Sequence, residues 1–486
     1  QAVGIAEYHG PRSQMMRCID APTMVKDGSG WGAMAGVSAA YLAQDRFTGA
    51  PAITMEDHEF GIETRCLHAG QIPDPATGAR ATPLYQTAAY VFDDTDHAAS
   101  LFNQQTFGNV YSRMSNPTTA VFEERMASLE GGRAALAVGS GMAAQMTALL
   151  TLLKQGDELV SASTLYGGSY SQFDVTFRRM GIDTVFVDPD DADNFRKAIT
   201  ERTKVVYIET IGNPSNNLID IQAVAKIAHD AGIPLMVDNT FATPFLCRPF
   251  EHGADIVVHS ATKFICGHGT SIGGVIIESG EFPWDNGKFP EMTQPSKGYH
   301  GLRFYETFGD FGFITKCRLE TLRTLGATLS PFNSFLFLQG LETLHIRMER
   351  HVQNAIKVAD FLNHHKSVAW VKYAGLADNP YHDLAQKYLP DGAGAILTFG
   401  IKGGRAAGVK FIENVEFLSH LANVGDAKTL IIHPASTTHR QLNDEEQAAA
   451  GVSADMVRIS VGLESIEDIL WDIEQALAVS QTPAIA

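Results

Sequence analysis

Cysteine is scarce in this chain: five cysteines occur among 486 residues, at positions 18, 66, 247, 266 and 317. Their number is odd and they are scattered, so they show neither a disulfide framework nor the paired spacing of a metal site. The histidines, including the one in the Gly-His-Gly at 267–269, show no metal-ligand spacing either. The sequence therefore predicts no metal, and its cysteine usage is typical of a protein of the reducing cytoplasm.

Long apolar runs and an excess of positive charge are also absent. No uninterrupted hydrophobic stretch is long enough to cross a bilayer, and the first residues lack the basic segment and apolar core of a secretory signal. Lys and Arg number 37 against 55 Asp and Glu, which gives a formal net charge of −18. Because nucleic-acid phosphates are bound by clustered cations, we expect neither a membrane nor a nucleic acid as a partner.

What the chain does contain is an alternation of short apolar runs and helical patterns between residues 121 and 315. Hydrophobic residues make up 45% of the chain and glycines number 44, as in an α/β protein with many tight loops. Strands that alternate with helices predict crossover connections and a mostly parallel sheet. The expected strands are 134–138, 158–162, 183–187, 204–209, 234–238, 255–259 and 273–278, and the expected helices are 121–131, 141–154, 169–180 and 221–231.

The remainder of the chain has a different pattern. Residues 279–312 are rich in glycine, proline and aromatics, and a loop of this length is usually functional or interfacial. Helical periodicity follows, and then a mixed α+β pattern. The expected elements are helices at 313–327 and 331–365 and strands at 368–373, 394–401, 429–432 and 457–461. We predict an N-terminal extension (1–58), an arm (59–120), a large domain (121–315) and a C-terminal domain (316–486).

The polar turn after the apolar run 256–258 contains the first candidate catalytic group. Lys263 follows this run, with the hydroxyl side chains of Ser260 and Thr262 beside it. A lysine at a strand end can form a Schiff base with an aldehyde while the hydroxyls bind a phosphate, and pyridoxal 5'-phosphate requires both. The alternative is an ordinary strand end with a solvated lysine, and this segment alone does not decide between the two.

A second segment favours the cofactor. The apolar run 233–237 is typical of a buried parallel strand, and it ends in Asp238-Asn239-Thr240. A carboxylate at the end of a buried strand is costly unless it has a charged partner, and the pyridinium nitrogen of the cofactor is such a partner. A turn-forming Asp-Asn pair is the alternative. Because Lys263 lies only 25 residues further on, we interpret Asp238 and Thr240 as cofactor-binding residues.

A glycine-serine turn at 139–141 opens a helical, apolar stretch and is a candidate phosphate cradle. The first turn of a helix offers free N–H groups and the positive end of the helix dipole to an anion. Ser140, Gly141 and Met142 would supply the backbone donors. Most such turns are only helix caps. The phosphate-binding interpretation is therefore favoured only because the turn occurs together with the other two segments.

Together these segments resemble the Cys/Met-metabolism family of pyridoxal-phosphate enzymes, and four further motifs in the same order strengthen the resemblance. They are YSRMSNPT (111–118), LYGGSY (165–170), ETIGNP (209–214) and VRISVGLE (457–464). The resemblance covers the chain from about Phe60 to the C-terminus. It implies an aspartate-aminotransferase-like (fold type I) α/β large domain with a mostly parallel sheet and a smaller α+β C-terminal domain.

The resemblance also implies roles for single residues. Tyr111 and Arg113 would reach into the neighbouring subunit's site and bind the cofactor phosphate. Tyr166 would stack on the cofactor ring and assist proton transfer, and Asn213 would contact the ring oxygen beside the substrate. Arg458 would hold the substrate carboxylate with its planar fork. Each residue alone has a plainer interpretation as a surface charge, a packed aromatic or a turn residue, and it is their shared order that favours the functional one.

Two segments point to one branch of the family. FICGHGTSIGGVI (264–276) and NVGDAKTLIIHPASTTH (423–439) resemble the O-acetylhomoserine sulfhydrylase branch, in which O-acetyl-L-homoserine and sulfide give L-homocysteine and acetate, and methanethiol would give methionine. Ser436 falls in the substrate-facing part of this motif, whereas Cys266 departs from the glycine expected there. Methionine γ-elimination and cystathionine synthesis are the first alternative, because they use the same cofactor residues. A cofactor-bound but catalytically idle protein is the second.

The resemblance further implies a cytoplasmic homotetramer built from dimers with shared active sites. Residues 1–58 do not share it. Their segment 27–53 instead looks similar to a stretch of the 2-methylcitrate dehydratase family, which is too short to form that enzyme's site. We expect an appended segment without chemistry of its own, and an extra packing or oligomer element is the alternative.

Overall fold

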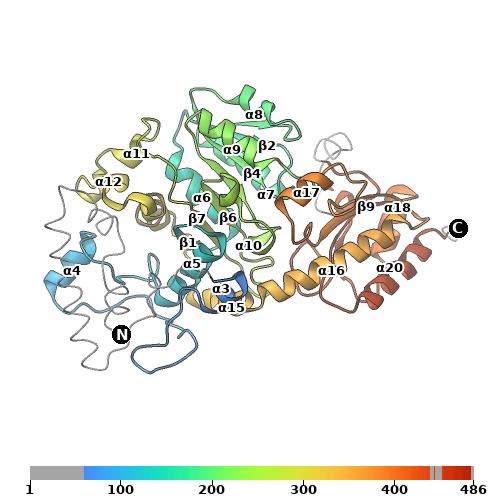
Figure 1. Cartoon of the computed structure of the whole chain (residues 1–486), viewed down its shortest axis with the longest axis horizontal. Coiled ribbons are helices and arrows are strands. Elements are labelled where there is room, and N and C mark those ends of the chain that lie inside the picture. The colour runs from blue at the N-terminus through green and yellow to red at the C-terminus, as the bar shows by residue number, and fades with distance from the viewer. Residues whose placement is uncertain (1–59, 438–439, 441–442, 444–450, 483–486) are drawn as a thin grey trace.

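The computed structural model describes residues 60–437, 440, 443 and 451–482, and in this part of the chain two β-sheets are each covered by helices (Figure 1). The segment that resembles 2-methylcitrate dehydratase lies outside the described residues. None of the helices that the structure describes is long and apolar enough to cross a membrane.

The larger sheet has seven strands in the order β1-β7-β6-β5-β4-β2-β3. Neighbours from β6 to β3 are parallel, whereas β7 runs antiparallel to both β1 and β6. The prediction of a mostly parallel α/β sheet is confirmed. The strands are β1 (Ala134–Val138), β2 (Glu158–Ala162), β3 (Asp183–Val187), β4 (Thr203–Glu209), β5 (Leu235–Asp238), β6 (Ile256–His259) and β7 (Gly274–Glu278).

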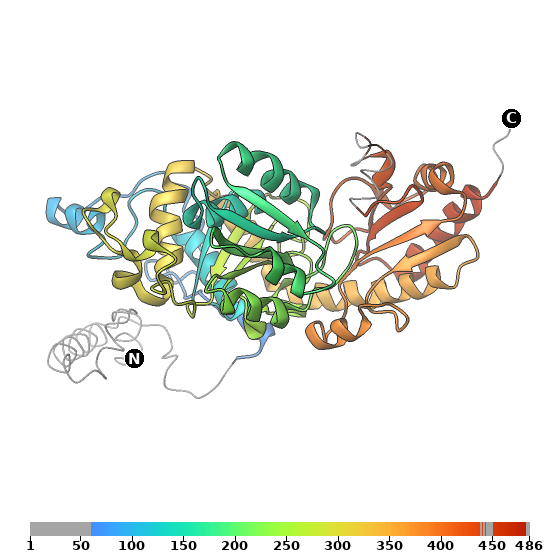
Figure 2. The same cartoon turned by 90° about the horizontal axis from the view of Figure 1, so that it is seen from above.

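Helices separate most of these strands in sequence and cover the sheet. Helices α5 and α6 pack against the β1–β7 end of the sheet, while α8 and α9 pack further along it (Figures 1 and 2). Helix α5 begins four residues before the predicted start, because Asn116 caps its N-terminus and Pro117 occupies its first position. The bounds are α5 (Pro117–Glu130), α6 (Gly141–Leu152), α7 (Gly167–Ser171), α8 (Asp193–Ala198), α9 (Ile221–Asp230) and α10 (Thr243–Leu246).

Two of the expected helices contain π-helical turns. The helix expected at 169–180 is α7 followed by a π-helical segment, Gln172–Phe177, and the one expected at 313–327 contains a second, Cys317–Leu322. Such turns are frequent at functional sites, and the predicted ring-stacking Tyr166 precedes α7, the helix that leads into the first of them. The flanking helices of the second are α13 (Gly312–Lys316) and α14 (Arg323–Leu325).

The smaller sheet has the order β10-β11-β12-β9-β8; α16 and α18 pack against it, and α20 packs on these two helices. Its four main strands lie within a residue or two of the expected ranges. The bounds are β8 (Val368–Lys372), β9 (Ile396–Ile401), β10 (Ser419–His420), β11 (Leu430–Ile432), β12 (Met456–Ser460), α16 (Leu344–Asn363), α17 (His382–Tyr388), α18 (Gly404–Ile412) and α20 (Ile466–Ser480). In Figure 1 the long helix α16 runs from the larger sheet to the smaller one.

The helix expected at 331–365 is interrupted at Thr343, which separates α15 (Pro331–Glu342) from α16. The guanidinium of Arg347 is buried at this interruption. It donates to the carbonyl of Gly340 at 2.6 Å and to that of Phe264 at 2.7 Å. Arg347 therefore ties this break to the turn that carries Lys263. Helix α15 packs on α5, and the predicted domain boundary at 315/316 stays a prediction.

The aromatic stretch 279–312 folds back as a packed layer with short helices, α11 (Pro290–Thr293) and α12 (Phe304–Phe308). Trp284, Phe289 and Phe304 are buried, and the Trp284 ring stacks on Phe313 at 5.3 Å between centroids. The arm contains two more helices, α3 (Ile62–His68) and α4 (Thr95–Phe102). The cysteines at 66, 247, 266 and 317 are all buried and unbridged.

Glu278→Gln is expected to become progressively more stable than the wild-type protein as the pH rises from about 5 to about 8. Glu278 ends β7 almost fully buried and accepts the backbone N–H of Ile314 at 2.9 Å. Burial raises its pKa from 4.5 to about 8. Across this window the folded chain holds a proton that the unfolded chain releases, so the free energy of unfolding falls by up to about 1 kcal/mol per pH unit.

The measurement is the thermal midpoint of both proteins over a pH series. Glu281→Gln is the matched control, because Glu281 is exposed three residues further on, and its midpoints should run parallel to those of the wild type. Parallel wild-type and Glu278→Gln curves would show that Glu278 releases its proton at the same pH in both states.

Candidate active site

Several of the predicted site residues lie at the carboxyl edge of strands β4, β5 and β6. Lys263 lies in the turn after β6, partly buried, and its Nζ donates to Oδ1 of Asn423 at 2.5 Å. Burial, and after it the nearby Arg458 guanidinium, lowers the pKa of Lys263 from 10.5 to about 8. An amine with this pKa is available in its neutral form near physiological pH, as a nucleophile or a base requires.

Asp238, the last residue of β5, is held by hydrogen bonds on both of its carboxylate oxygens. The backbone N–H and the hydroxyl of Thr240 donate to Oδ1 at 2.9 and 2.5 Å. The amide of Gln145 and the hydroxyl of Tyr207, both buried, lie 3.3 Å from Oδ2. The carboxylate is therefore fixed in orientation, and among the described residues no cationic side chain forms an ion pair with it, which suits a protonated pyridine nitrogen as its partner.

The N-terminus of α6 approaches the turn after β6 so closely that only glycine fits. A Cβ on Gly141 would lie 2.6 Å from the Cβ of Ser260. The Ser140 side chain caps the helix by accepting the N–H of Ala143 at 3.0 Å, which leaves the N–H groups of Gly141 and Met142 without a partner inside the helix. This is the arrangement of an anion cradle, with the Ser260 side chain facing it.

The second predicted hydroxyl, that of Thr262, is engaged with the backbone of Gly273. It donates to the Gly273 carbonyl at 3.2 Å and accepts from the Gly273 N–H at 3.1 Å. The hydroxyl thereby joins the Lys263 turn to the start of β7. Its contact with a cofactor phosphate stays a prediction.

The residues predicted to contact the ring and the substrate come from three loops. The ring of Tyr166 is half exposed at the start of α7, and Asn213 is buried just after β4. From β12 of the smaller sheet, Arg458 donates to Oδ1 of Asn213 at 3.1 Å. Burial lowers the pKa of Arg458 from 12.5 to about 10, so its guanidinium stays charged at neutral pH. Both sheets thus contribute to one site.

Tyr111 and Arg113 lie on the arm, and both side chains are exposed. The Arg113 guanidinium stands over the Tyr111 ring at 5.5 Å, and the Arg113 carbonyl accepts a hydrogen bond from Thr328. The backbone is therefore anchored to the chain while the two side chains face outward. That arrangement is compatible with their use by a neighbouring subunit, which stays a prediction.

Ser436 ends a short 3-10 turn after β11, and its hydroxyl is engaged with His433. The Oγ lies 2.9 Å from Nδ1 of His433 and 3.3 Å from the carbonyl of the same residue. These contacts orient the turn. Its predicted contact with the substrate stays a prediction.

Sequence reasoning missed four residues that the structure places in this site: Gln145, Tyr207, Glu209 and Asn423. Two of them lie within segments that the sequence had singled out, ETIGNP and NVGDAKTL, and the signal for them was membership of those motifs. Gln145 lies one turn into α6, on the side that faces β5, and only the pairing of helix and sheet reveals it.

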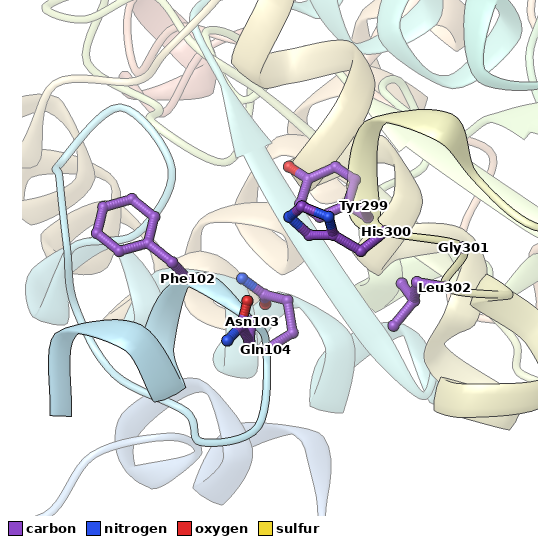
Figure 3. A pocket seen from close by; sticks show the side chains of 7 residues that line it. All are labelled: Phe102, Asn103, Gln104, Tyr299, His300, Gly301 and Leu302. Atoms are coloured by element: carbon purple, nitrogen blue, oxygen red, sulfur yellow. The ribbon is translucent and has the colours of Figure 1, made fainter. Parts of the chain in front are cut away.

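A separate hollow of about 380 Å³ lies at the arm, between α4 and the turn at 299–302 (Figure 3). None of the predicted site residues lines it. Its walls are Phe102, Asn103, Gln104, Tyr299, His300, Gly301 and Leu302. In the described part of the chain, no cluster of three or more His, Cys, Asp or Glu side chains could hold a metal ion.

The chain is similar to a known protein family and to several characterised proteins. Residues 63–478 match the family described as Cys/Met metabolism PLP-dependent enzyme. The chain is 55% identical over 427 residues to an O-acetyl-L-homoserine sulfhydrylase of Leptospira meyeri, an alignment that covers 86% of this chain and 97% of the relative. It is 55% identical over 422 residues to a homocysteine synthase of Schizosaccharomyces pombe, covering 86% and 98%.

Among solved structures, a putative O-acetylhomoserine (thiol)-lyase of Campylobacter jejuni is similar at a TM-score of 0.84 and 40% identity. The similarity covers 86% of this chain and 100% of that one. That structure contains a pyridoxyl-lysine phosphate residue.

Proposed function

This chain belongs to the Cys/Met metabolism PLP-dependent enzyme family, and we propose that it converts O-acetyl-L-homoserine and sulfide into L-homocysteine and acetate. The observation that carries the proposal is an identity of 55%, over nearly their full length, with relatives named O-acetyl-L-homoserine sulfhydrylase and homocysteine synthase. The geometry supports it, because the partly buried Lys263 follows β6, Asp238 ends the neighbouring strand β5, and the Arg458 guanidinium is near enough to lower the pKa of Lys263.

The described residues fit pyridoxal phosphate. The Gly141 cradle beside Ser260 offers free N–H groups to a phosphate, and Asp238 offers an oriented carboxylate to the ring nitrogen. Lys263 supplies the amine for the aldehyde. When bound, pyridoxal phosphate supplies an electron sink for negative charge at the substrate Cα.

The protein's own residues perform the remaining steps. Arg458 would hold the substrate α-carboxylate and so aim its Cα at Lys263. Lys263 would take the proton from Cα, pass it on to the bound cofactor and then, with its amine neutral again, take one from Cβ, which lets the ester oxygen leave Cγ with the bonding electron pair as acetate. The sulfur of sulfide then forms the new bond to Cγ, and Lys263 returns the protons. Asn423 would hold the lysine Nζ between these transfers.

The sulfur donor and the assembly belong to the same proposal. Methanethiol in place of sulfide would give methionine by the same route. We propose a homotetramer of dimers with shared sites, because the arm exposes Val91 at 95%, Phe107 at 83% and the Tyr111–Arg113 pair. A cytoplasmic location accords with the four buried, unbridged cysteines among the described residues.

A product assay tests the proposal. The purified protein, loaded with pyridoxal phosphate, is given O-acetylhomoserine with and without sulfide, and homocysteine and 2-oxobutyrate are quantified. Homocysteine that depends on sulfide, with little keto acid, is the expected result. Keto acid in both reactions would instead indicate a γ-lyase, and neither product would indicate another leaving group or an idle relative.

A further inference from the structure

Glu209 is a buried acidic residue that has no part in the reaction steps proposed for Lys263 and Arg458. It is the last residue of β4, is 5% exposed, and lies directly beside Asp238 in the register of the parallel pair β4–β5. Among the described residues no cationic side chain forms an ion pair with it. Burial, and after it the charge of Asp238, raises the pKa of Glu209 well above its usual range. A carboxylate in this position is costly, so its contacts indicate what it contributes.

Those contacts are with the backbone of two loops that line the site. Oε1 accepts the N–H of Tyr166 at 2.8 Å, and the carboxylate also accepts the backbone N–H of Asn213. The first loop follows β2 and the second follows β4. One side chain thus sets the distance between the residue expected to stack on the ring and the residue expected to contact the ring oxygen.

The same network extends to the substrate side of the site. The side chain of Asn213 accepts from the Arg458 guanidinium at 3.1 Å, and Arg458 comes from the smaller sheet. A displacement of the Asn213 backbone therefore moves the acceptor that orients Arg458. Glu209, Asn213 and Arg458 form a continuous path from the larger sheet to the substrate-carboxylate site.

We propose that Glu209 is a positioning residue that fixes Tyr166 and Asn213 relative to each other and, through Asn213, the orientation of Arg458. This deepens the function proposed above and rests on it. Without the carboxyl group, two backbone N–H groups lose their acceptor and both loops relax. The cofactor ring and the substrate carboxylate then lose their mutual alignment, although Lys263 and Asp238 are untouched.

The test compares Glu209→Gln and Glu209→Asp with the wild-type holoenzyme. Gln replaces one carboxyl oxygen with an amide donor that faces one of the two N–H groups, and Asp keeps the carboxyl group but is too short to reach both. We expect kcat/KM for O-acetylhomoserine to fall by about 10- to 100-fold, mainly through KM, since misplacement by about 1 Å has effects of this size. We also expect the visible circular dichroism per bound cofactor to change, because it reports how the ring is held.

Glu158→Gln is the matched control. Glu158 is the first residue of β2, 3% exposed, and accepts from Thr203 at 2.6 Å at the opposite edge of the same sheet. This variant should lower the thermal midpoint while leaving the dichroism and KM within about twofold of wild type.

Unchanged dichroism and KM in both Glu209 variants would overturn the proposal, and so would equal changes in Glu158→Gln. If one Glu209 variant fails to fold, the other decides. The dichroism needs no turnover, so it still tests Glu209 if the wild-type protein makes no homocysteine, an outcome that would overturn only the proposed reaction.

Discussion

Lys263→Ala is expected to reduce sulfide-dependent homocysteine formation by at least about a thousandfold. The substitution removes the amine that both binds the cofactor aldehyde and transfers protons at Cα and Cβ. The burial that lowers the pKa of Lys263 to about 8 makes its neutral form available, and its Nζ is held by Asn423 at 2.5 Å. The rate is measured by the product assay under saturating pyridoxal phosphate.

A second measurement, of cofactor attachment, distinguishes a variant that lacks the reactive amine from one that has failed to fold. After borohydride treatment, mass spectrometry should find pyridoxal phosphate attached to Lys263 in the wild type and to no residue in the variant. Lys226→Ala is the control, because Lys226 is exposed on α9 and bonds only to Asp230 at 2.8 Å among the described residues. A Lys263→Ala protein that retains a tenth of the wild-type rate would refute the assignment of Lys263.

The strands were predictable because their signal is local. The runs 134–138, 158–162 and 183–187 coincide with β1, β2 and β3, since each is a short apolar stretch bounded by turn residues. The place of β7 was not predictable. It lies between β1 and β6 and runs antiparallel to both, and only strand pairing over long sequence distances determines that order.

Helix interiors were also predictable, whereas several helix ends and interruptions depend on tertiary contacts. The break at Thr343 is one example. The periodicity of 331–365 is continuous, but at the break the Arg347 guanidinium binds the Gly340 carbonyl together with the Phe264 carbonyl of the Lys263 turn. No local preference contains that information, because the partners are far apart in the sequence.

The site residues also fall into two groups, those that the sequence identifies and those that only the structure reveals. Residues that would touch cofactor or substrate, such as Lys263, Asp238 and Arg458, stand in recognisable motifs. Residues that hold those groups in place, such as Gln145 and Glu209, act on other parts of the protein, and their role follows from distances alone. A sequence can therefore identify the reacting groups of such a site before it identifies what orients them.

Arg458→Lys is expected to raise KM for O-acetylhomoserine by about 100-fold with a smaller change in kcat. Lysine keeps the positive charge but lacks the planar fork that can hold a carboxylate and, at the same time, bond to Asn213 at 3.1 Å. Loss of one partner from a buried, hydrogen-bonded charge pair has an effect of this order.

Initial rates over a range of O-acetylhomoserine concentrations, at fixed sulfide, separate the two constants. Arg350→Lys is the control, because Arg350 is exposed on α16 and should leave both constants within about twofold of wild type. A lower kcat with an unchanged KM would contradict carboxylate binding and would assign Arg458 to the chemical step, because Arg458 also lowers the pKa of Lys263.

Removal of the charge, in Arg458→Leu, distinguishes these cases further. It should raise KM beyond the value for lysine if Arg458 binds the carboxylate, and it should raise the pKa of Lys263 whichever role is correct.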